Sequence, residues 1–412
     1  MEAQDQGGAT HSSLEDVITR IRDCVRISTV EAQAATHHQS LPEDIIVRIM
    51  SKLPVKSLLR FKSVSKRWRT LITTDSHLVT THLRHSSASR LCIVSGNERV
   101  STFPCRKYVE RMLLLRDEST AEDLEIVLYH HWFRFEIVGS CNGLVCVALL
   151  AIARTWIVDT VLWNPATKEW RYLPEPISSE SQRRDSNLLS FGYDHDNSDY
   201  KLVRVELKAR KMVRVHVFSR SSNSWRQATG TDLSDKEVAQ EVGVIVNGVL
   251  YLMAHDENSS RNGRTILSFN LCDEKFEDEM RPPLFKKRSE FCLSKWKDSL
   301  TLQEVEFPSF IFWVKGDMSS SAGAQRSYSW TRLLKFEFAT PAADHYFVGA
   351  WKNGFLFTKY LNGGAYDSLD SGELISIEPL SHKPITTLKK IGSEAMFSGA
   401  FDYVESLVSV YS

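Results

Sequence analysis

The spacing of apolar residues changes once along this chain of 412 residues, from a helical period before residue 85 to short β-type runs after residue 90. Between Leu41 and Ile72 the period is helical. A first helix is predicted by five apolar residues on one face, Ile45, Ile46, Ile49, Met50 and Leu53, with Glu43 and Asp44 in its first turn. Pro54 ends that helix and begins a second, and Ser65 is expected to cap a third that carries Trp68.

These three predicted helices carry more large apolar side chains than they can bury against each other, because small units bury little of their surface. The surplus apolar face predicts a binding partner. A fourth short helix is expected from Asp75 to Leu83, capped by Asp75 or Ser76.

Residues 1–39 form an N-terminal extension that begins with a polar stretch and contains one amphipathic segment, Ser12 to Arg26. Ser12 and Glu15 have the spacing of a capping box, which predicts a helix there. Such a helix would either pack on the helices that follow or bind a separate partner, and packing within the chain is the simpler hypothesis.

After residue 90 the sequence repeats a unit of about 50 residues. One half of each unit is an apolar strand, a turn and a strand with an aromatic residue. Three aromatic pairs are each seven residues apart: Trp163 and Trp170, Phe218 and Trp225, and Phe269 and Phe276. Further copies of this half-unit occur at 311–330, where the turn is longer, and at 374–385.

The other half of each unit is a hairpin with an Asn-Gly turn or a variant of it. Asn142-Gly143, Asn247-Gly248 and Asn353-Gly354 predict type I′ turns, in which Gly143, Gly248 and Gly354 would have positive φ. Four strands in a unit of this length are typical of a kelch-like β-propeller. Five units are visible. We expect 90–95, 112–117 and 395–410 to build a shared closing blade, which gives about six blades, although five or seven also fit.

The motifs together resemble a known family. The run LPEDIIVRIMSKLPVKSLLRFKSVSKRW (41–68) resembles the F-box. The runs GSCNGLVCV, LWNPATKEWRYLP, FGYDHDNSDYKLVRV, SWTRLLKF and YVESLVSV resemble the F-box-associated region of plant F-box/kelch-repeat proteins. The resemblance implies an α+β multidomain chain, with an all-α F-box domain at 40–85 and an all-β kelch-like propeller at 90–412.

Composition excludes some classes of function. The net charge is +0, which favours neither nucleic acid nor anionic membrane as a partner, although 41–72 holds eight Lys/Arg against two carboxylates. No apolar run is long enough for a membrane span, and no secretory signal is visible. Seven scattered cysteines indicate reduced thiols, and hence a cytoplasmic or nuclear protein.

No catalytic motif is recognisable, so neither a catalytic residue nor a metal or cofactor is expected. His130-His131 lacks further ligands at suitable spacing and is interpreted as structural. Asp194, Asp196 and Asp199 lack the glycine and the glutamate of a calcium loop and are interpreted as a solvated turn.

The resemblance implies a substrate receptor of an SCF-type ubiquitin ligase, a protein without catalytic activity of its own. The F-box would bind a Skp-type adaptor, which joins cullin and RING subunits, and the propeller would hold an unknown protein target. The residues that match adaptor-facing positions or support them are Leu41, Pro42, Ile45, Ile49, Leu53, Pro54, Leu58 and Trp68. Two alternatives remain: nucleic-acid binding by the basic stretch 41–84 and, with less support, a propeller enzyme.

The long polar loops predict where a target would bind. In a four-stranded meander, the loops between second and third strands and the links between blades lie on one face of the ring. The stretches 176–186, 255–264 and 361–372 fall on that face, and only 316–327 falls on the other. Long loops on a rigid scaffold often carry binding residues. The candidate target contacts are Arg183, Arg184, Arg261, Arg264 and Tyr366.

Overall fold

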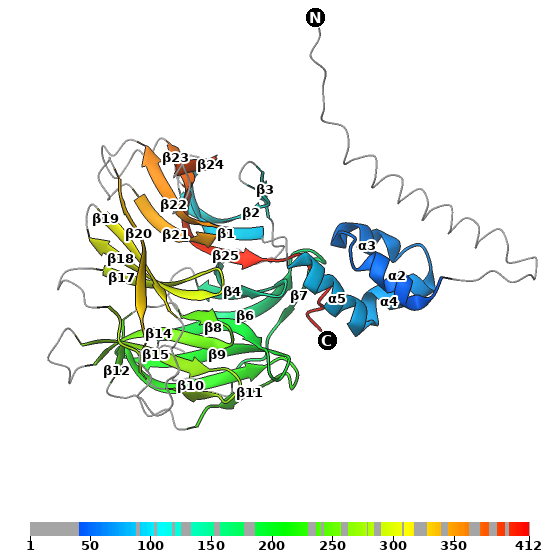
Figure 1. Ribbon diagram of the computed structural model, residues 1–412, viewed down its shortest axis with the longest axis horizontal. Helices are drawn as coiled ribbons and strands as arrows, with labels where there is room; N and C mark the ends of the chain where they lie inside the picture. Colours follow the sequence, from blue (N-terminus) through cyan, green and yellow to red (C-terminus); the bar gives the residue numbers. More distant parts are fainter. Residues whose placement is uncertain are drawn as a thin grey trace, which may run out of the picture. The chain divides into compact units, whose positions relative to one another are not determined.

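A computed structural model of the protein gives the arrangement of four helices and 25 strands among the residues that it describes (Figure 1). The residues that it describes are 41–87, 91–102, 105–117, 120–124, 133–151, 157–176, 186–229, 236–239, 243–256, 263–277, 279–283, 290–306, 309–316, 328–338, 345–361, 371–378, 385–391 and 395–411. The predicted segment Ser12–Arg26 and the pair His130-His131 lie outside them. The chain forms two compact units, Met1–Val47 and Arg48–Ser412. No helix among the described residues is both long and apolar enough to cross a membrane.

The helices lie where the apolar spacing predicts them: α2 (Glu43–Met50), α3 (Val55–Phe61), α4 (Lys66–Thr74) and α5 (Ser76–Ser86). The Ser65 hydroxyl caps α4 by accepting a hydrogen bond from the Trp68 amide at 3.1 Å. A carboxylate oxygen of Asp75 caps α5 by accepting from the Leu78 amide at 2.7 Å. Helix α2 is shorter than its apolar face, because Leu53 already lies in the turn before Pro54.

Residues 48–87 have a core of their own. Leu58 and Leu78 are fully buried, and Leu71 and Ile72 of α4 are nearly so. The rings of Phe61 and Trp68 meet edge to face at 5.2 Å between centroids, which joins α3 to α4. We call the described residues 41–87 the helical module.

The β region consists of six four-stranded antiparallel units, here called blades 1 to 6. Blade 1 is β4 (Phe133–Cys141), β5 (Leu144–Ala151), β6 (Ile157–Asn164) and β7 (Glu169–Tyr172). Blade 2 is β8 (Ser186–Asp194), β9 (Asp199–Lys208), β10 (Lys211–Ser219) and β11 (Ser224–Gln227). Blade 3 is β13 (Val244–Val246), β14 (Val249–Asp256), β15 (Arg264–Asn270) and β16 (Lys275–Phe276).

The remaining blades follow the same meander. Blade 4 is β17 (Glu290–Trp296), β18 (Ser299–Glu306), β19 (Ser309–Lys315) and β20 (Trp330–Glu337). Blade 5 is β21 (His345–Trp351), β22 (Gly354–Leu361), β23 (Ser371–Ile377) and β24 (Ile385–Ile391). Blade 6 is β25 (Ala395–Tyr403), β1 (Leu91–Thr102), β2 (Cys105–Leu115) and β3 (Ala121–Asp123).

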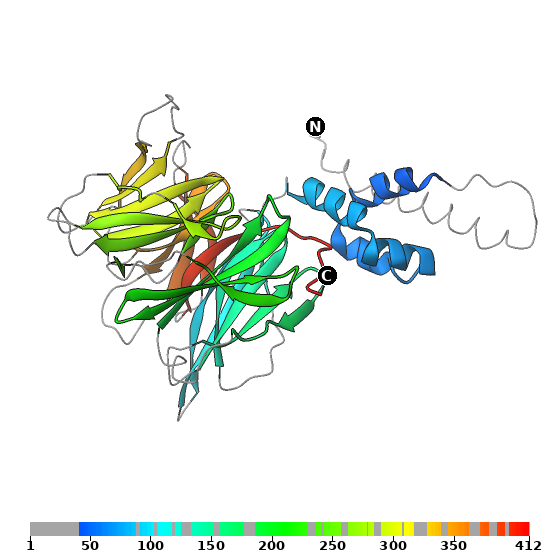
Figure 2. The same cartoon turned by 90° about the horizontal axis from the view of Figure 1, so that it is seen from below.

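Blade 6 closes the ring with strands from both ends of the β region, as predicted. The C-terminal strand β25 is its innermost strand and pairs with β1, and β25 also contacts β21 and β4 of the neighbouring blades (Figures 1 and 2). A buried apolar cluster fills each of the six spaces between adjacent blades. Successive residues of β1 belong to different clusters, because their side chains point to opposite faces of the blade. Ile93 packs toward blade 1 and Val94 packs toward blade 5.

The aromatic pairs of the repeat are confirmed as cross-strand partners. Trp163 lies opposite Trp170, Phe218 opposite Trp225 and Phe269 opposite Phe276. The two rings of the last pair are 5.1 Å apart in an edge-to-face arrangement. Each pair therefore fastens the short outer strand of its blade to the third strand.

The predicted hairpin turns are correct at two positions and wrong at the third. Asn142 and Gly143 have φ of 49° and 84°, and Asn247 and Gly248 have φ of 49° and 76°, as type I′ turns require. Gly354 instead begins strand β22, opposite Trp351, and the turn is formed by Lys352 and Asn353. Lys352 there has the positive φ of 52°. The Asn-Gly pair is shifted by one residue relative to the turn.

One additional strand joins two blades. Strand β12 (Lys236–Val238) pairs with β10 of blade 2 and with β14 of blade 3, so that these blades form one continuous nine-stranded sheet. The repeat does not predict this strand, because β12 belongs to the link between two units.

Candidate functional site

The helical module exposes large apolar side chains although its core is filled. Leu41, Ile45, Ile49 and Val64 keep 49%, 41%, 38% and 44% of their surface in water. Ile45 and Ile49 are one turn apart on α2, so they lie on the same side of that helix. This exposure agrees with the surplus apolar face that the spacing predicts.

The eight predicted adaptor-facing residues fall into two groups. Leu41, Pro42, Ile45, Ile49 and Pro54 are exposed, and Trp68 is half-buried. Leu53 and Leu58 are buried, with 9% and 0% exposed, so they stabilise the module from within. A role of the exposed group in adaptor binding stays a prediction.

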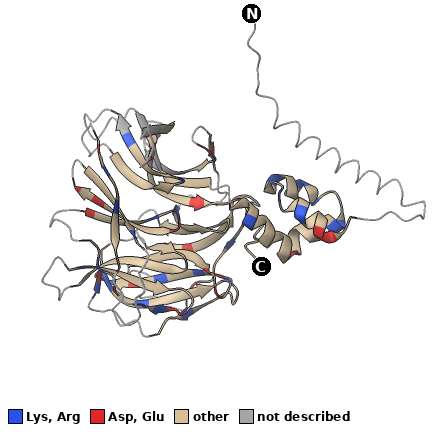
Figure 3. Ribbon diagram, in the orientation of Figure 1, with Lys and Arg blue, Asp and Glu red and all other residues tan. Residues whose placement is uncertain are grey.

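The module is also strongly basic at its surface. Seven of the eight Lys/Arg between 41 and 72 are exposed, and Lys62 is half-buried. Figure 3 shows these positions in blue on the helices, beside the acidic first turn of α2. A partner that contacts this surface would gain electrostatic attraction from acidic groups.

The connections of the ring sort into two faces. The turns after each first and third strand lie on one face, and the second-to-third connections and the links between blades lie on the other, which we call the loop face. Of the five predicted target contacts, Arg183, Arg184, Arg261 and Tyr366 lie outside the described residues. Arg264 begins β15 on the loop face, and its guanidinium carbon is 4.3 Å from the centroid of the Phe291 ring.

The innermost strands surround a central channel with a volume of about 410 Å³. Its lining combines glycine and apolar residues with a few charged ones, among them Glu136 and Lys295. The hydroxyl oxygens of Ser140 and Ser294 line it without a protein hydrogen-bond partner. The channel has the size and polarity for ordered water.

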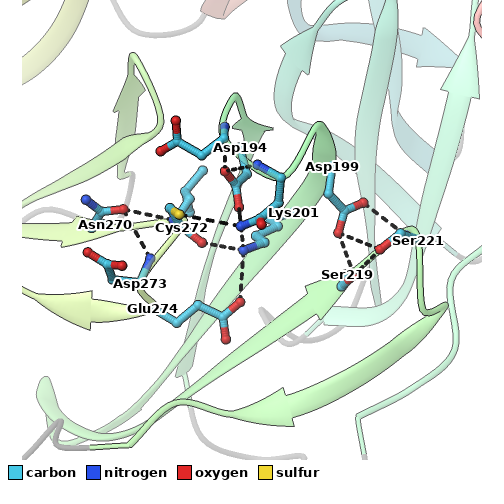
Figure 4. A network of polar contacts seen from close by, with 12 residues as sticks. Asp194, Asp199, Lys201, Ser219, Ser221, Asn270, Cys272, Asp273 and Glu274 are labelled. Carbon is cyan, nitrogen blue, oxygen red and sulfur yellow. Dashed lines mark hydrogen bonds and ion pairs between the residues drawn. The ribbon is translucent and has the colours of Figure 1, made fainter.

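A buried ionic network joins blades 2 and 3 on the face opposite the loop face (Figure 4). The Lys201 ammonium is 2.7 Å from a carboxylate oxygen of Asp194 and 3.0 Å from one of Glu274. It also donates to the Leu271 carbonyl, and Arg226 pairs with Glu274. Lys201 is only 2% exposed and Asp194 only 1%, so the charges compensate each other out of contact with water.

This network corrects the interpretation of Asp194, Asp196 and Asp199 as a solvated turn. Only Asp196 is exposed, whereas Asp194 and Asp199 are buried. Asp199 accepts hydrogen bonds from the Ser219 and Ser221 hydroxyls at 2.5 and 3.0 Å. The hydrogen bonds of Asp194 to Lys201 and Asn197 outweigh its burial and lower its pKa.

The charges around Asp194 disfavour a metal ion beside the Lys201 network. Asp194, Asp196 and Cys272 offer ligand atoms that are mutually close enough to hold one. The Lys201 ammonium, however, already supplies the positive charge that Asp194 faces. A cation there would meet direct repulsion.

Comparison with known proteins defines the class of this chain, in which an F-box domain precedes a β-propeller. Residues 39–80 match the model of the F-box domain, and residues 90–410 match that of the F-box associated beta propeller domain. The second match covers most of the chain. The protein belongs to the F-box-associated β-propeller family.

Its relatives include several F-box proteins of Arabidopsis thaliana. A putative F-box protein is 27% identical over 57% of this chain and 59% of its own length. An F-box/kelch-repeat protein is 26% identical over 72% of this chain and 79% of its own. The chain thus spans about three-fifths of the first relative. Among solved structures, a β-propeller domain from Pyrococcus furiosus aligns over 71% of the chain and 93% of its own, with 9% identity and a TM-score of 0.35, too low to support any argument.

Sequence reasoning missed two features of these surfaces. Strand β12 lies in a link between two repeat units, where the repeat pattern predicts no strand. The sequence holds one signal for the Lys201 network, because Lys201 follows the acidic turn 194–199 closely and precedes the apolar pair Leu202-Val203 of β9. A lysine in such a buried strand predicts a carboxylate partner.

Proposed function

We propose that this protein is the substrate-recognition subunit of an SCF-type cullin-RING E3 ubiquitin ligase. The F-box binds a Skp-type adaptor, which joins it to cullin and RING subunits, and the propeller holds a protein target for ubiquitination. The chain contributes proximity and orientation, and the chemistry takes place on other subunits. It would act in the cytoplasm, the nucleus or both. Membership in the F-box-associated β-propeller family supports this proposal.

Adaptor binding rests on one observation, the exposure of Ile45 and Ile49 on helix α2. These side chains are not needed for the core of the helical module, because Leu58 and Leu78 already fill it. Large apolar side chains that share one exposed helix side are typical of a protein interface. The exposed basic side chains around them would steer an acidic adaptor.

The test removes the exposed pair. Ile45→Ala with Ile49→Ala should weaken binding of a purified Skp-type adaptor by about two to four decades, because each buried side chain contributes roughly 1.5–3 kcal/mol. The matched control is Val213→Ala with Tyr346→Ala, two exposed apolar residues of the propeller, and it should bind normally. Wild-type affinity of a folded Ile45/Ile49 variant would refute the assignment.

The proposed target site predicts that loops on the loop face are needed for target ubiquitination and that loops on the opposite face are not. Replacing 177–185, 257–263 and 362–370 by tight turns, while keeping the strand ends Asp256 and Arg264, should abolish target ubiquitination and leave adaptor binding intact. Shortening 317–327 on the opposite face should change neither. Full target turnover by the triple variant would contradict a target site on the loop face.

Nucleic-acid binding is the alternative that the exposed Lys/Arg of the module favour. It predicts a salt-dependent shift of labelled DNA by the full chain. The ligase proposal predicts that the Skp-type adaptor binds in preference to DNA at physiological salt.

A further inference from the structure

The innermost strand of each blade is the edge of its sheet nearest the centre of the ring. β4, β8, β17, β21 and β25 each stand at one end of their strand order, and β13 pairs only with β14. Each of these six strands contacts the next around the ring. Within the described sheets, each therefore turns one row of main-chain N–H and C=O groups toward the central channel without a strand partner. The channel wall offers these groups as hydrogen-bond donors and acceptors to the contents of the channel.

The central channel continues into a mouth on the face opposite the loop face. The channel has a volume of about 410 Å³, and the mouth, which lies among the hairpin turns after the innermost strands, has a volume of about 250 Å³. The exposed turn residues His195 and Asn247 border the mouth, so it is open to solvent. A cavity of this size suits a small molecule. The channel and the mouth are continuous, because five residues line both: Ser140, Phe191, Ile245, Lys295 and Asp402.

The Lys295 ammonium has no counter-charge in the part of the chain that the structure describes, where it forms neither an ion pair nor a hydrogen bond. Lys295 is half-buried and belongs to β17 of blade 4. Its charge nevertheless acts on blade 1, because burial raises the pKa of the Cys141 thiol to about 12 and Lys295 opposes that rise. Blade 1 is three blades away around the ring, so the lysine side chain extends into the mouth.

The carboxylates that line the channel are engaged elsewhere. Glu136 lies 2.6 Å from the Arg134 guanidinium. Asp402 takes part in an interaction with another group of the chain. A charge that is half-buried without a partner is costly, and an anion beside Lys295 would remove that cost. The mouth therefore favours negative charge at the Lys295 ammonium.

We propose that the central channel binds a small organic acid, whose single carboxylate pairs with Lys295 and whose apolar body fills the channel. Phe191 and Ile245 line the channel and the mouth, and Phe347 and Phe401 line the channel alone. Small-molecule sites commonly combine such an apolar lining with a few polar groups that fix the orientation of the ligand. The inference goes beyond the proposed receptor function and requires neither adaptor nor target.

The charge of the site favours a carboxylate over a phosphate. One ammonium neutralises one negative charge, and a phosphate dianion would bring a second charge into an apolar space without a second free cation to pair with it. The Ser140 hydroxyl, which is buried without a hydrogen-bond partner among the described residues, adds a neutral donor where the channel meets the mouth.

The test measures binding to the full chain by isothermal titration calorimetry. The probes are phenylpropionate and octanoate, their primary amides, phenylpropylamine and phenyl phosphate. The amides keep the apolar body and remove the charge, the amine reverses the charge, and the phosphate adds a second negative charge. A channel that holds only ordered water predicts no binding of any probe.

The variant is Lys295→Met, which keeps an unbranched apolar side chain and removes the charge. The matched control is Lys297→Met, two residues further along the same hairpin. Lys297 is exposed, lines neither the channel nor the mouth, and holds its ammonium 4.5 Å from the centroid of the Trp296 ring. Thermal melts verify that both variants fold.

We expect the wild type to bind each carboxylate at least about tenfold more tightly than its amide, because a charged pair contributes more than a neutral contact. Lys295→Met should lower the affinity for each carboxylate to that for its amide, and it should change the affinity for the amides by less than about twofold. Lys297→Met should bind every probe as the wild type does.

Four results would overturn the inference: no carboxylate binds, acid and amide bind the wild type equally, the phosphate or the amine binds more tightly than phenylpropionate, or the two variants bind the carboxylates equally. Tighter binding of the amine would assign the mouth to Asp402. The first three results need no variant, so they decide the question even where Lys295→Met does not fold. Every measurement is made without adaptor, so the outcome is independent of the proposed ligase function.

Discussion

The side-chain amide nitrogen of Asn164 donates a hydrogen bond of 2.7 Å to the main-chain carbonyl of Val408, 244 positions later in the sequence. It donates a second bond, of 3.1 Å, to the carbonyl of Ser406. Both acceptors belong to the tail after β25, which also accepts from Arg220 of blade 2 and donates from Tyr411 to the Trp170 carbonyl. The tail therefore ties the innermost strand of blade 6 to blades 1 and 2.

Asn164→Ala should destabilise the propeller by about 2–4 kcal/mol, because it leaves two buried carbonyls without their donor and also removes the acceptor of the turn amides of Ala166 and Thr167. Chemical denaturation measures the loss. The matched control is Asn270→Ala, which removes the equivalent turn acceptor in blade 3 but no bond to the tail. Equal losses in both variants would mean that the tail bonds contribute nothing.

The three glycines of the Asn-Gly pairs should respond differently to substitution. Gly248 has positive φ, and a Cβ there would meet its nearest atom only at 3.6 Å, so Gly248→Asn should be nearly neutral and Gly248→Val should cost about 1–2 kcal/mol. Gly143→Asn should remain destabilising, because a Cβ would overlap Ser406 Oγ. Gly354→Ala should destabilise by steric overlap and not by backbone strain, because a Cβ would overlap Ser376 Oγ and crowd the Ile377 carbonyl oxygen at 3.2 Å. Melting temperatures of the set separate conformational from steric effects, and a severe loss in Gly248→Asn would contradict this assignment.

The sequence predicts the meander and the shared closing blade because both leave local patterns. An Asn-Gly turn needs only its two residues, and aromatic residues seven apart, such as Phe269 and Phe276, fix the register of a strand pair by themselves. On the helical module the period alone identifies Ile45 and Ile49, since a helix side is a local property.

Features that depend on contacts between distant segments could not be predicted in this way. Leu58 and Ile49 have the same spacing pattern, and only the packing of α3 shows that Leu58 is core and Ile49 is surface. The bridge β12 forms because a link happens to lie between two sheet edges. Gly354 misled the turn prediction because its freedom is needed for a close approach to Ser376 instead of for positive φ.

Lys201→Met should destabilise the propeller by about 3–5 kcal/mol, because it leaves the buried carboxylate of Asp194 without its countercharge. Adding Asp194→Asn in the same chain should recover part of the loss. In Lys201→Met the pKa of Asp194 is no longer lowered by the lysine, so the deficit should shrink as the pH is reduced from 7.5 to 5. A deficit independent of pH would show that Asp194 does not carry the loss. Urea unfolding curves at pH 7.5 and pH 5 measure the difference in unfolding free energy between Lys201→Met and the wild type.

The last prediction concerns His82, a buried residue of α5 whose Nε2 lies 3.0 Å from the Leu53 carbonyl and whose Nδ1 lies 3.3 Å from the Ser86 hydroxyl. Burial lowers the pKa of His82, although the Leu53 carbonyl and Glu405 raise it, so the folded module favours the neutral ring. The unfolded chain then binds more protons below its ordinary pKa of 6.5. Stability from His82 is therefore complete above that pH and falls as the pH drops below it. Hydrogen exchange of the α5 amides, corrected for intrinsic rates, should accelerate between pH 7.5 and 5.5 in the wild type and less in His82→Gln. Equal acceleration in both proteins would assign the pH dependence to other groups.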